Sequence, residues 1–310
     1  MQKEPNRPLI SVITPVYNQV GLIGQAIESV IHQEDILVEH IVMDGGSTDG
    51  TLDVLARYPH LKVLSGPDRG MYDALNRGLE LAQGDVIGFL NSDDLYVENT
   101  FYEILQIFKD EHILIAIGEA IVFSETLGGV QNVISRFSPE SIKSLLELST
   151  LSGPFFNAWF FRKSLFEREG KFNSNYRIVA DRELMLRFAL SGLEYKKINK
   201  AVYMYRRHSG SMTFDITDQK IERIVNEHIF MTSSYLEQKN LPKQARRLIR
   251  DIRTRNTLEM AVRSLKKLNL RKFAYFLRRG MEYDAFWFIK FTRRIIRASK
   301  IFGARKDIEP

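Results

Sequence analysis

The sequence predicts an α/β protein built on a mostly parallel sheet flanked by helices. Two observations carry this prediction: short apolar runs alternate with longer segments of helical period over the first hundred residues, and a polar loop follows each apolar run. Such alternation is typical of βαβ units with right-handed crossovers. The 310 residues, of which 44% are apolar and 26% charged, are enough for one large or two modest globular cores.

The expected elements follow one another along the chain in this alternation. The first four strands are short and apolar, at 9–14, 39–43, 62–64 and 86–90. Segments of helical period separate them, at 22–32, 51–58 and 71–82. The order is then less regular, with a helix at 98–109, an apolar run at 113–117, a hairpin-like stretch at 127–133, a helix at 139–148, an apolar patch at 155–161, a helix from Asp181 and a strand at 202–205. From about residue 218 every segment has a helical pattern.

Charge divides the chain into two parts. Residues 241–310 carry 20 Lys and Arg against 6 Asp and Glu, a net charge of +14. The other 240 residues carry 24 Lys and Arg against 32 Asp and Glu, a net charge of −8. We therefore expect an α/β domain over 1–215 and a basic helical region over 216–310, suited to different partners.

Composition excludes several kinds of site. The chain has no cysteine, which rules out disulfides, a thiolate nucleophile and a cysteine-ligated zinc. Charges and prolines precede a short apolar run at the N-terminus, so no secretory signal is expected. No stretch of 18 residues is apolar enough to cross a membrane. These features favour a cytoplasmic location.

Polar loops follow the first four expected strands and bring carboxylates to one edge of the sheet. The loops read TPVYN from Thr14, DGGSTDG from Asp44, GPDRG from Gly66 and NSDD from Asn91. They contribute four carboxylates, those of Asp44, Asp68, Asp93 and Asp94. Ligands of open α/β sheets bind beyond the carboxyl ends of the strands, where these groups would repel one another. A divalent metal that carries a phosphate ligand relieves such repulsion, whereas turn formation alone is the simpler explanation of any one loop.

Four segments together resemble the family 2 glycosyltransferases of the GT-A fold, a Rossmann-like fold of nucleotide-diphospho-sugar transferases. They read SVITPVYNQ, DGGSTDGT, SGPDRGMYDALNRGLELAQGDVIGFLNSDD and VADRELMLRF, and the resemblance covers roughly residues 8–210. It is greatest to enzymes of bacterial exopolysaccharide, capsule or O-antigen assembly. The resemblance implies inverting transfer of a sugar from a nucleotide-diphosphate sugar, with a UDP-sugar favoured. The implied acceptor is a hydroxyl of a saccharide or lipid-linked molecule, and the implied cofactor is Mg²⁺ or Mn²⁺.

The resemblance also implies which residues bind the donor. It places six residues around the nucleoside and diphosphate: Thr14, Pro15, Tyr17, Asp44, Asp68 and Arg69. Asp44 would accept the N3–H of a uracil. Arg69 precedes a helix N-terminus, where anions bind favourably. Arg207 and His208 follow the last expected strand, where relatives have a segment that covers the diphosphate.

For the metal and the catalytic base, the resemblance implies three carboxylates. Asp93 is the metal ligand, and Asp94 shares that role. The first acid of the family's D-x-D signature is Asn91 here, which leaves one fewer negative charge. Asp181 is the catalytic base, although many relatives have a Glu-Asp pair where this chain has Ala-Asp. Without the resemblance, Asp181 would be interpreted as a helix N-cap.

Two other functions fit parts of this pattern. A sugar-nucleotide pyrophosphorylase would have a similar sheet, but its glycine- and arginine-rich signature is missing after the first strand. A non-catalytic protein that binds sugar nucleotides or anionic polymers is the third interpretation. Retention of Asp93 and Asp181 argues against it.

The basic C-terminal region requires a partner of its own. Aromatic and basic residues alternate over 273–297, a pattern that suits the interface of an anionic membrane. We therefore expect the segment 271–300 to hold the protein peripherally at the inner face of the cell membrane. Packing of these helices on the acidic domain as a structural brace is the alternative. No nucleic-acid motif accompanies the basic residues, and no nucleic-acid partner is expected.

Overall fold

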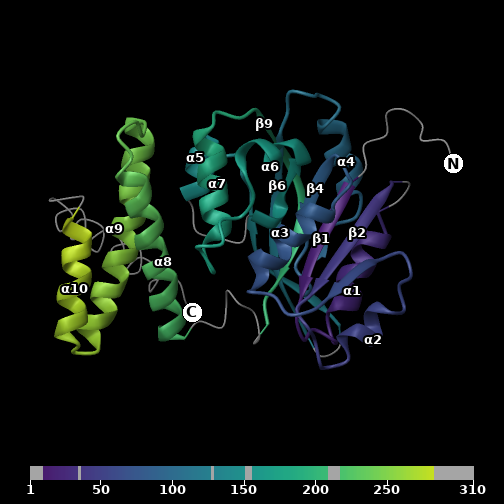
Figure 1. Cartoon of the computed structure of the whole chain (residues 1–310), viewed down its shortest axis with the longest axis horizontal. Coiled ribbons are helices and arrows are strands. Elements are labelled where there is room, and N and C mark those ends of the chain that lie inside the picture. Colours follow the sequence, from purple (N-terminus) through teal and green to yellow (C-terminus); the bar gives the residue numbers. More distant parts are fainter. Residues whose placement is uncertain (1–9, 34–35, 127–128, 151–155, 209–216, 283–310) are drawn as a thin grey trace, which may run out of the picture. The chain divides into compact units, whose positions relative to one another are not determined.

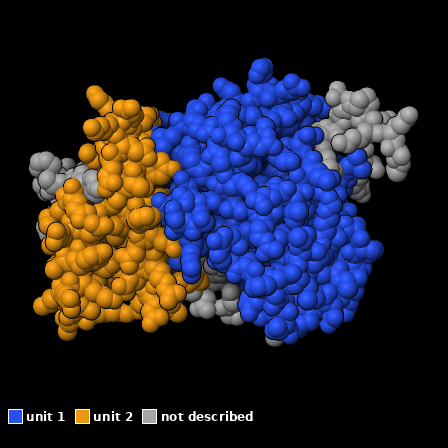
Figure 2. Space-filling model, viewed as in Figure 1, with its two compact units in different colours: residues 1–216 blue, residues 217–310 orange. Residues whose placement is uncertain are grey.

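The computed structural model describes residues 10–33, 36–126, 129–150, 156–208 and 217–282 (Figure 1). The chain divides into two compact units, residues 1–216 and residues 217–310, which Figure 2 colours separately. Each unit is described by itself below. Within the described residues, no helix is both long enough and apolar enough to cross a bilayer.

A nine-stranded sheet forms the centre of the first unit, with the order β3-β2-β1-β4-β8-β6-β9-β5 and with β7 paired to β6 outside this path. The strands are β1 (Ile10–Val16), β2 (Val38–Asp44), β3 (Lys62–Ser65), β4 (Val86–Phe89), β5 (Leu95–Tyr96), β6 (Ile115–Glu125), β7 (Gln131–Phe137), β8 (Trp159–Arg162) and β9 (Tyr195–Arg206). Strands β3, β2, β1 and β4 are parallel, and the β1–β2 register sets Val16 opposite Asp44. The carboxyl ends of these strands therefore meet at one edge.

Helices connect these strands as the sequence predicts, so the α/β class is confirmed (Figure 1). The helices of this unit are α1 (Ile23–Ile31), α2 (Thr51–Leu55), α3 (Met71–Leu81), α4 (Thr100–Ile107), α5 (Leu145–Thr150), the 3₁₀ turn η1 (Phe156–Ala158), α6 (Lys163–Glu169) and α7 (Ala180–Leu190). Helix α3 packs closely on β1 because Gly78 has no side chain: a Cβ there would overlap Ile13. This contact fixes the height of α3 above the sheet.

Beyond β4 the sheet is mixed, which the sequence pattern does not reveal. The apolar patch at 156–161 becomes η1 and β8, and β8 lies antiparallel between β4 and β6. The expected hairpin near 127–133 is the β6–β7 pair, of which residues 127–128 lie outside the described residues. A four-residue apolar run is compatible with either strand direction, so its direction depends on distant partners.

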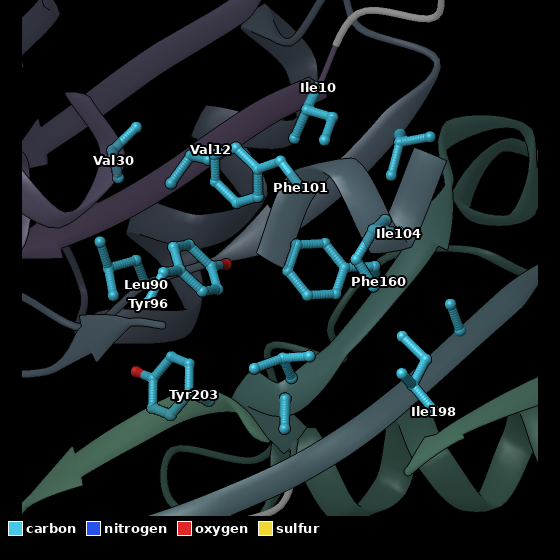
Figure 3. Packing of buried hydrophobic residues seen from close by; sticks show 14 of the residues in the cluster. Ile10, Val12, Val30, Leu90, Tyr96, Phe101, Ile104, Phe160, Ile198 and Tyr203 are labelled. Carbon is cyan, nitrogen blue, oxygen red and sulfur yellow. The ribbon is translucent and has the colours of Figure 1, made fainter. Parts of the chain in front are cut away.

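Aromatic side chains fill the core between the sheet and its helices. Tyr96 packs against both Phe101 and Phe160, which Figure 3 shows beside it. The ring centroids of Phe101 and Phe160 lie 5.1 Å and 5.4 Å from that of Tyr96. The Tyr96 hydroxyl is buried and donates to the Phe89 carbonyl at 3.0 Å. The aromatic patch around Phe160 is therefore core, not surface.

Three helices make up the described part of the second unit: α8 (Asp218–Leu236), α9 (Lys243–Lys266) and α10 (Leu270–Met281). Their core includes Ile229, Met260 and Phe276, with Phe273 packed against it. Arg253 is fully buried there, and its guanidinium donates to the Ile229 carbonyl at 2.9 Å and binds Glu282 at 2.6 Å. This basic region thus has a core of its own.

His40 on β2 makes stability depend on pH. The ring is buried, and its Nε2 lies 2.9 Å from the Thr14 hydroxyl. Burial, with a smaller contribution from His60, lowers the pKa of His40 to about 3. The folded protein therefore keeps this ring neutral, whereas the unfolded chain protonates it below about pH 6.5.

We expect His40 to contribute fully to the free energy of unfolding above pH 6.5, and this contribution to be lost as the pH falls from 6.5 toward 3. At pH 5.5 the loss should be about 1.4 kcal/mol. Urea unfolding at pH 7.5 and pH 5.5 measures the free energy of unfolding of wild type and of His40→Gln. The carboxylates titrate alike in both proteins, so the difference between the two losses is due to His40. Equal losses in the two proteins would show that His40 does not cause the effect.

Candidate functional site

Asp44, the last residue of β2, is held rigidly at the edge of the sheet. Its side chain is buried, and Oδ2 accepts hydrogen bonds from Gly46 N at 3.1 Å, Ser47 N at 3.1 Å and Ser65 Oγ at 2.5 Å. Burial raises the pKa of Asp44, but the hydrogen bonds from Ser47, Ser65 and Gly46 outweigh it and hold the pKa below its usual value. The result is an ionised carboxylate of fixed orientation.

Tyr17 and Asp68 converge on the glycine that follows Asp44. A Cβ on Gly45 would lie 2.9 Å from Asp68 Oδ2 and 3.4 Å from Tyr17 Cδ2, so a larger residue there would require the Asp68 carboxylate to shift. The Tyr17 ring remains 61% exposed, and Asp68 Oδ1 accepts from Gly70 N at 2.8 Å. Three of the predicted loops therefore meet around Gly45.

Three predicted donor residues lie differently from this group. Thr14 is fully buried with its hydroxyl on His40, so its side chain does not reach the edge. Pro15 lies within β1 and is half-buried. The Arg69 guanidinium is exposed and binds Asp73 of α3, with Nη2 2.6 Å from Oδ1.

The β4–β5 loop buries Asp94. Its Oδ1 accepts from Arg206 N at 2.7 Å, and its Oδ2 accepts from the Tyr203 hydroxyl at 2.7 Å and from Asn91 Nδ2 at 2.9 Å. Burial, with a contribution from Asp93, raises the pKa of Asp94 to about 8, and these hydrogen bonds oppose the rise. Both oxygens of Asp94 are thus occupied by protein donors.

Asp93 differs from its neighbour because its carboxylate points to the end of β9. Its Oδ2 lies 2.9 Å from His208 Nε2, and both side chains are partly exposed. The described residues contain no group of three or more His, Asp or Glu side chains that could enclose a metal. An Asp–His pair fits a divalent ion whose other ligands come from a diphosphate and water, because Mg²⁺ sites commonly use few carboxylates and the phosphates of a substrate. His208, predicted to lie near the donor, is therefore next to the predicted metal ligand.

Arg206 joins the loop of Asp93 to the rest of the unit, and the sequence interpretation missed it. The side chain is 3% exposed, with Nε donating to the Asp93 carbonyl at 2.8 Å and Nη2 to Gln25 Oε1 at 2.5 Å. Nη1 pairs with Glu125, and the guanidinium lies over the Phe123 ring. An arginine after a predicted strand is normally expected to be exposed. Arg206 can be buried because it pairs with Glu125 on β6, which is 81 residues away along the chain. Its neighbour Arg207 is exposed, and Arg207 N donates to the Phe123 carbonyl at 2.7 Å.

Asp181 lies inside the first turn of α7, and the N-cap position belongs to Val179. Its Oδ1 accepts from Arg182 N at 2.7 Å. Burial raises the pKa of Asp181, although Arg182 and a hydrogen bond from Tyr72 oppose the rise. Tyr72 lies in the first turn of α3, soon after the loop that contains Asp68, and the sequence offered no signal for its contact with Asp181 of α7. A carboxylate with a raised pKa is suited to accept a proton.

The first unit thus contains a fixed carboxylate at the end of β2, an Asp–His pair in the loops after β4 and β9, and a carboxylate of raised pKa in α7. The chain belongs to glycosyl transferase family 2, whose family model matches residues 11–170, a little over half of the chain. It is therefore an enzyme, a glycosyltransferase, as the sequence predicts.

Relatives and solved structures agree with this assignment. A PGL/p-HBAD biosynthesis glycosyltransferase of Mycobacterium bovis is 27% identical over 227 residues, which cover 70% of this chain and 84% of the relative. S. aureus TarS 1–349 in complex with UDP-GlcNAc has a TM-score of 0.64 at 18% identity and covers 89% of this chain and 83% of that one. The mannosyltransferase PcManGT from Pyrobaculum calidifontis, in complex with GDP-Man and Mn²⁺, has a TM-score of 0.56 at 18% identity, covering 90% and 88%. The structural likeness confirms the GT-A fold.

Proposed function

We propose that the protein is a metal-dependent, inverting glycosyltransferase that uses a UDP-sugar and acts in cell-surface polysaccharide biosynthesis. The acceptor is a hydroxyl of a saccharide or lipid-linked molecule. The observation that supports this most is the Asp93–His208 pair at the sheet edge that also carries Asp44. Nucleoside and diphosphate ends of one donor could be bound together at this edge.

Asp44 and Tyr17 bind the nucleoside in this proposal. The Asp44 carboxylate is ionised and fixed, so it accepts the N3–H of a uracil, and the exposed Tyr17 ring offers an apolar face to the base. Asp68 lies next to both and is placed to bind the ribose. Thr14 and Arg69 contribute less than the sequence suggests, because His40 and Asp73 occupy their side chains.

Asp93 and His208 hold the divalent metal, and Asp94 holds the loop. An imidazole ligand favours Mn²⁺ over Mg²⁺, since Mg²⁺ prefers an octahedron of oxygen donors. When bound, the ion supplies positive charge opposite the departing diphosphate. Arg207, exposed beside His208, adds a cation for the same phosphates.

Asp181 is the general base of the transfer. Its carboxylate removes the proton of the acceptor hydroxyl as that oxygen bonds to the anomeric carbon and the bond from this carbon to the diphosphate oxygen breaks. A single displacement of this kind inverts the anomeric configuration. Arg182 N donates to Oδ1, and this hydrogen bond fixes the direction of the carboxylate.

A donor panel tests the proposal. We expect UDP-sugars with Mn²⁺ to raise the melting temperature, since a ligand at 100 times its Kd stabilises by about 2.7 kcal/mol. With an acceptor saccharide, free UDP should form in equal amount to the product. Donor binding without any UDP release would favour the non-catalytic binding protein, and formation of pyrophosphate from a nucleoside triphosphate would favour the pyrophosphorylase.

Arg206 is expected to position Asp93 rather than to contact substrate. Arg206→Lys keeps the charge but loses the planar fork that binds Glu125, Gln25 and the Asp93 carbonyl together. We expect the Mn²⁺ concentration for half-maximal activity to rise about 10–100-fold, the usual effect of lost support around a metal ligand. Arg177→Lys, which changes an exposed arginine, is the control. An unchanged Mn²⁺ requirement in Arg206→Lys would contradict the positioning role.

The basic second unit supports a peripheral location at the inner face of an anionic membrane. Of the predicted membrane segment 271–300, residues 283–300 lie outside the described residues. Within the described part, Phe276 is buried and Phe273 packs against the core, so neither ring is available to lipid. The contact must therefore involve other residues of this unit.

A further inference from the structure

The turn between α9 and α10 has a leucine where the backbone favours glycine. Helix α9 ends in a Schellman motif, in which Leu268 N donates to the Leu265 carbonyl and Asn269 N to the Ser264 carbonyl, both at 2.9 Å. Leu268 adopts the left-handed conformation that this motif requires, with φ of 55°. Glycine reaches this conformation without strain, whereas a residue with a Cβ does not.

Packing among the described residues of this unit does not compensate for this strain. Leu268 is 83% exposed, and it is flanked by Leu270 at 66% and Leu265 at 47% exposure. None of the three belongs to the core cluster of α8, α9 and α10. Leu265, Leu268 and Leu270 are thus exposed at one turn, which we call the leucine tip. A residue that is unfavourable both for the backbone and for exposure to water indicates a function.

Basic side chains surround this leucine tip. Four of them are exposed: Lys266, Lys267, Arg271 and Lys272. Lys267 binds Asp218 and Lys272 binds Glu222, so the acids near the tip are neutralised. Within the described part of the chain, Lys266 and Arg271 have no ion pair, and the surface around the leucines is therefore positive.

We propose that the leucine tip, Leu265, Leu268 and Leu270, inserts into the interface of an anionic membrane, with Lys266 and Arg271 on the lipid headgroups. A bilayer accepts exposed leucines on a turn because its apolar interior needs no complementary shape, and its anionic headgroups match the basic side chains. This extends the proposed function by giving the enzyme access to a lipid-linked acceptor. Vesicle binding is measured without turnover, so its result is independent of the test of transferase activity.

Leu268→Gly separates membrane insertion from folding. Glycine suits the positive φ, so the melting temperature of the full chain should stay equal or rise. Binding to vesicles of equal phosphatidylglycerol and phosphatidylcholine should weaken by roughly tenfold in co-sedimentation, because one leucine no longer enters the interface. Leu268→Trp should bind at least as well as wild type. Wild-type binding by Leu268→Gly, or no binding of wild type to these vesicles, overturns the proposal.

A second pair of variants tests the charges. Lys266→Glu with Arg271→Glu should weaken binding to anionic vesicles by at least tenfold and remove its dependence on salt. Lys239→Glu with Lys243→Glu makes the same charge change at exposed positions around the α8–α9 turn, at the opposite end of α9. This control should bind nearly as tightly as wild type. Equal losses in the two pairs would mean general attraction by net charge and would overturn the assignment to the tip.

Discussion

Asp181→Asn should lower kcat by about 10²–10⁴-fold with little change in donor affinity, because a positioned base contributes that much to proton transfer. The side chain is partly buried at the start of α7 and accepts a hydrogen bond from Arg182 N. The Oδ1 of an asparagine can accept the same bond, so the fold should persist. Single-turnover kinetics with a UDP-sugar would measure the chemical step, and a thermal shift would measure donor binding. Asp53→Asn, at an exposed acid of α2, is the matched control.

The pH profile gives an independent check on Asp181. Burial raises the pKa of this carboxyl, and a base acts only when ionised. Activity should therefore fall on the acid side at a higher pH than an ordinary aspartate would give, and Asp181→Asn should lack this limb. A wild-type rate in the variant, or a product that retains the donor's anomeric configuration, contradicts the assignment.

Asp93→Ala should reduce turnover by on the order of 10²-fold or more, because the charge opposite the leaving diphosphate is the largest electrostatic contribution in such a site. EDTA should have the same effect on wild type. His208→Ala should keep part of the activity and require more Mn²⁺, since Asp93 remains. Initial rates across a Mn²⁺ titration measure both effects.

The control for this series is Glu98→Gln, which removes an exposed acid five residues from Asp93. It should retain the wild-type rate and Mn²⁺ requirement. Undiminished turnover of Asp93→Ala in the presence of EDTA would exclude a metal at this position.

The parallel half of the sheet could be predicted because each strand and helix there is encoded locally. Strands β1 to β4 are apolar runs separated by helical periods, and the polar loops after them are visible in the sequence. Asp44 is an example: a residue at the end of an apolar run must lie at the carboxyl edge. The direction of β8 could not be predicted, because it is set by pairing with Val86 and Ile115 in strands far along the chain.

The candidate site shows the same limit. Asp93 and Asp94 are adjacent in sequence and identical in residue type, yet one is partly exposed toward His208 and the other is buried. The difference comes from Tyr203 and Arg206, which are 109 and 112 residues away from Asp94 and bind both of its oxygens. No local pattern reports a hydrogen bond of this span. The aromatic residues of α10 could not be placed for the same reason, since Phe276 faces α8 and α9 only once the three helices pack.

The anchoring of Asp94 affects the entropy of donor binding. Fixing one backbone residue costs about 1–2 kcal/mol of conformational entropy. Because the bonds from Asn91, Tyr203 and Arg206 already order the β4–β5 loop, this cost is met during folding and not when the donor arrives. A loop that is ordered before binding benefits all diphosphate donors equally. In the proposed function, discrimination between nucleotides therefore falls to the other end of the site, where Tyr17 and Asp44 would meet the base.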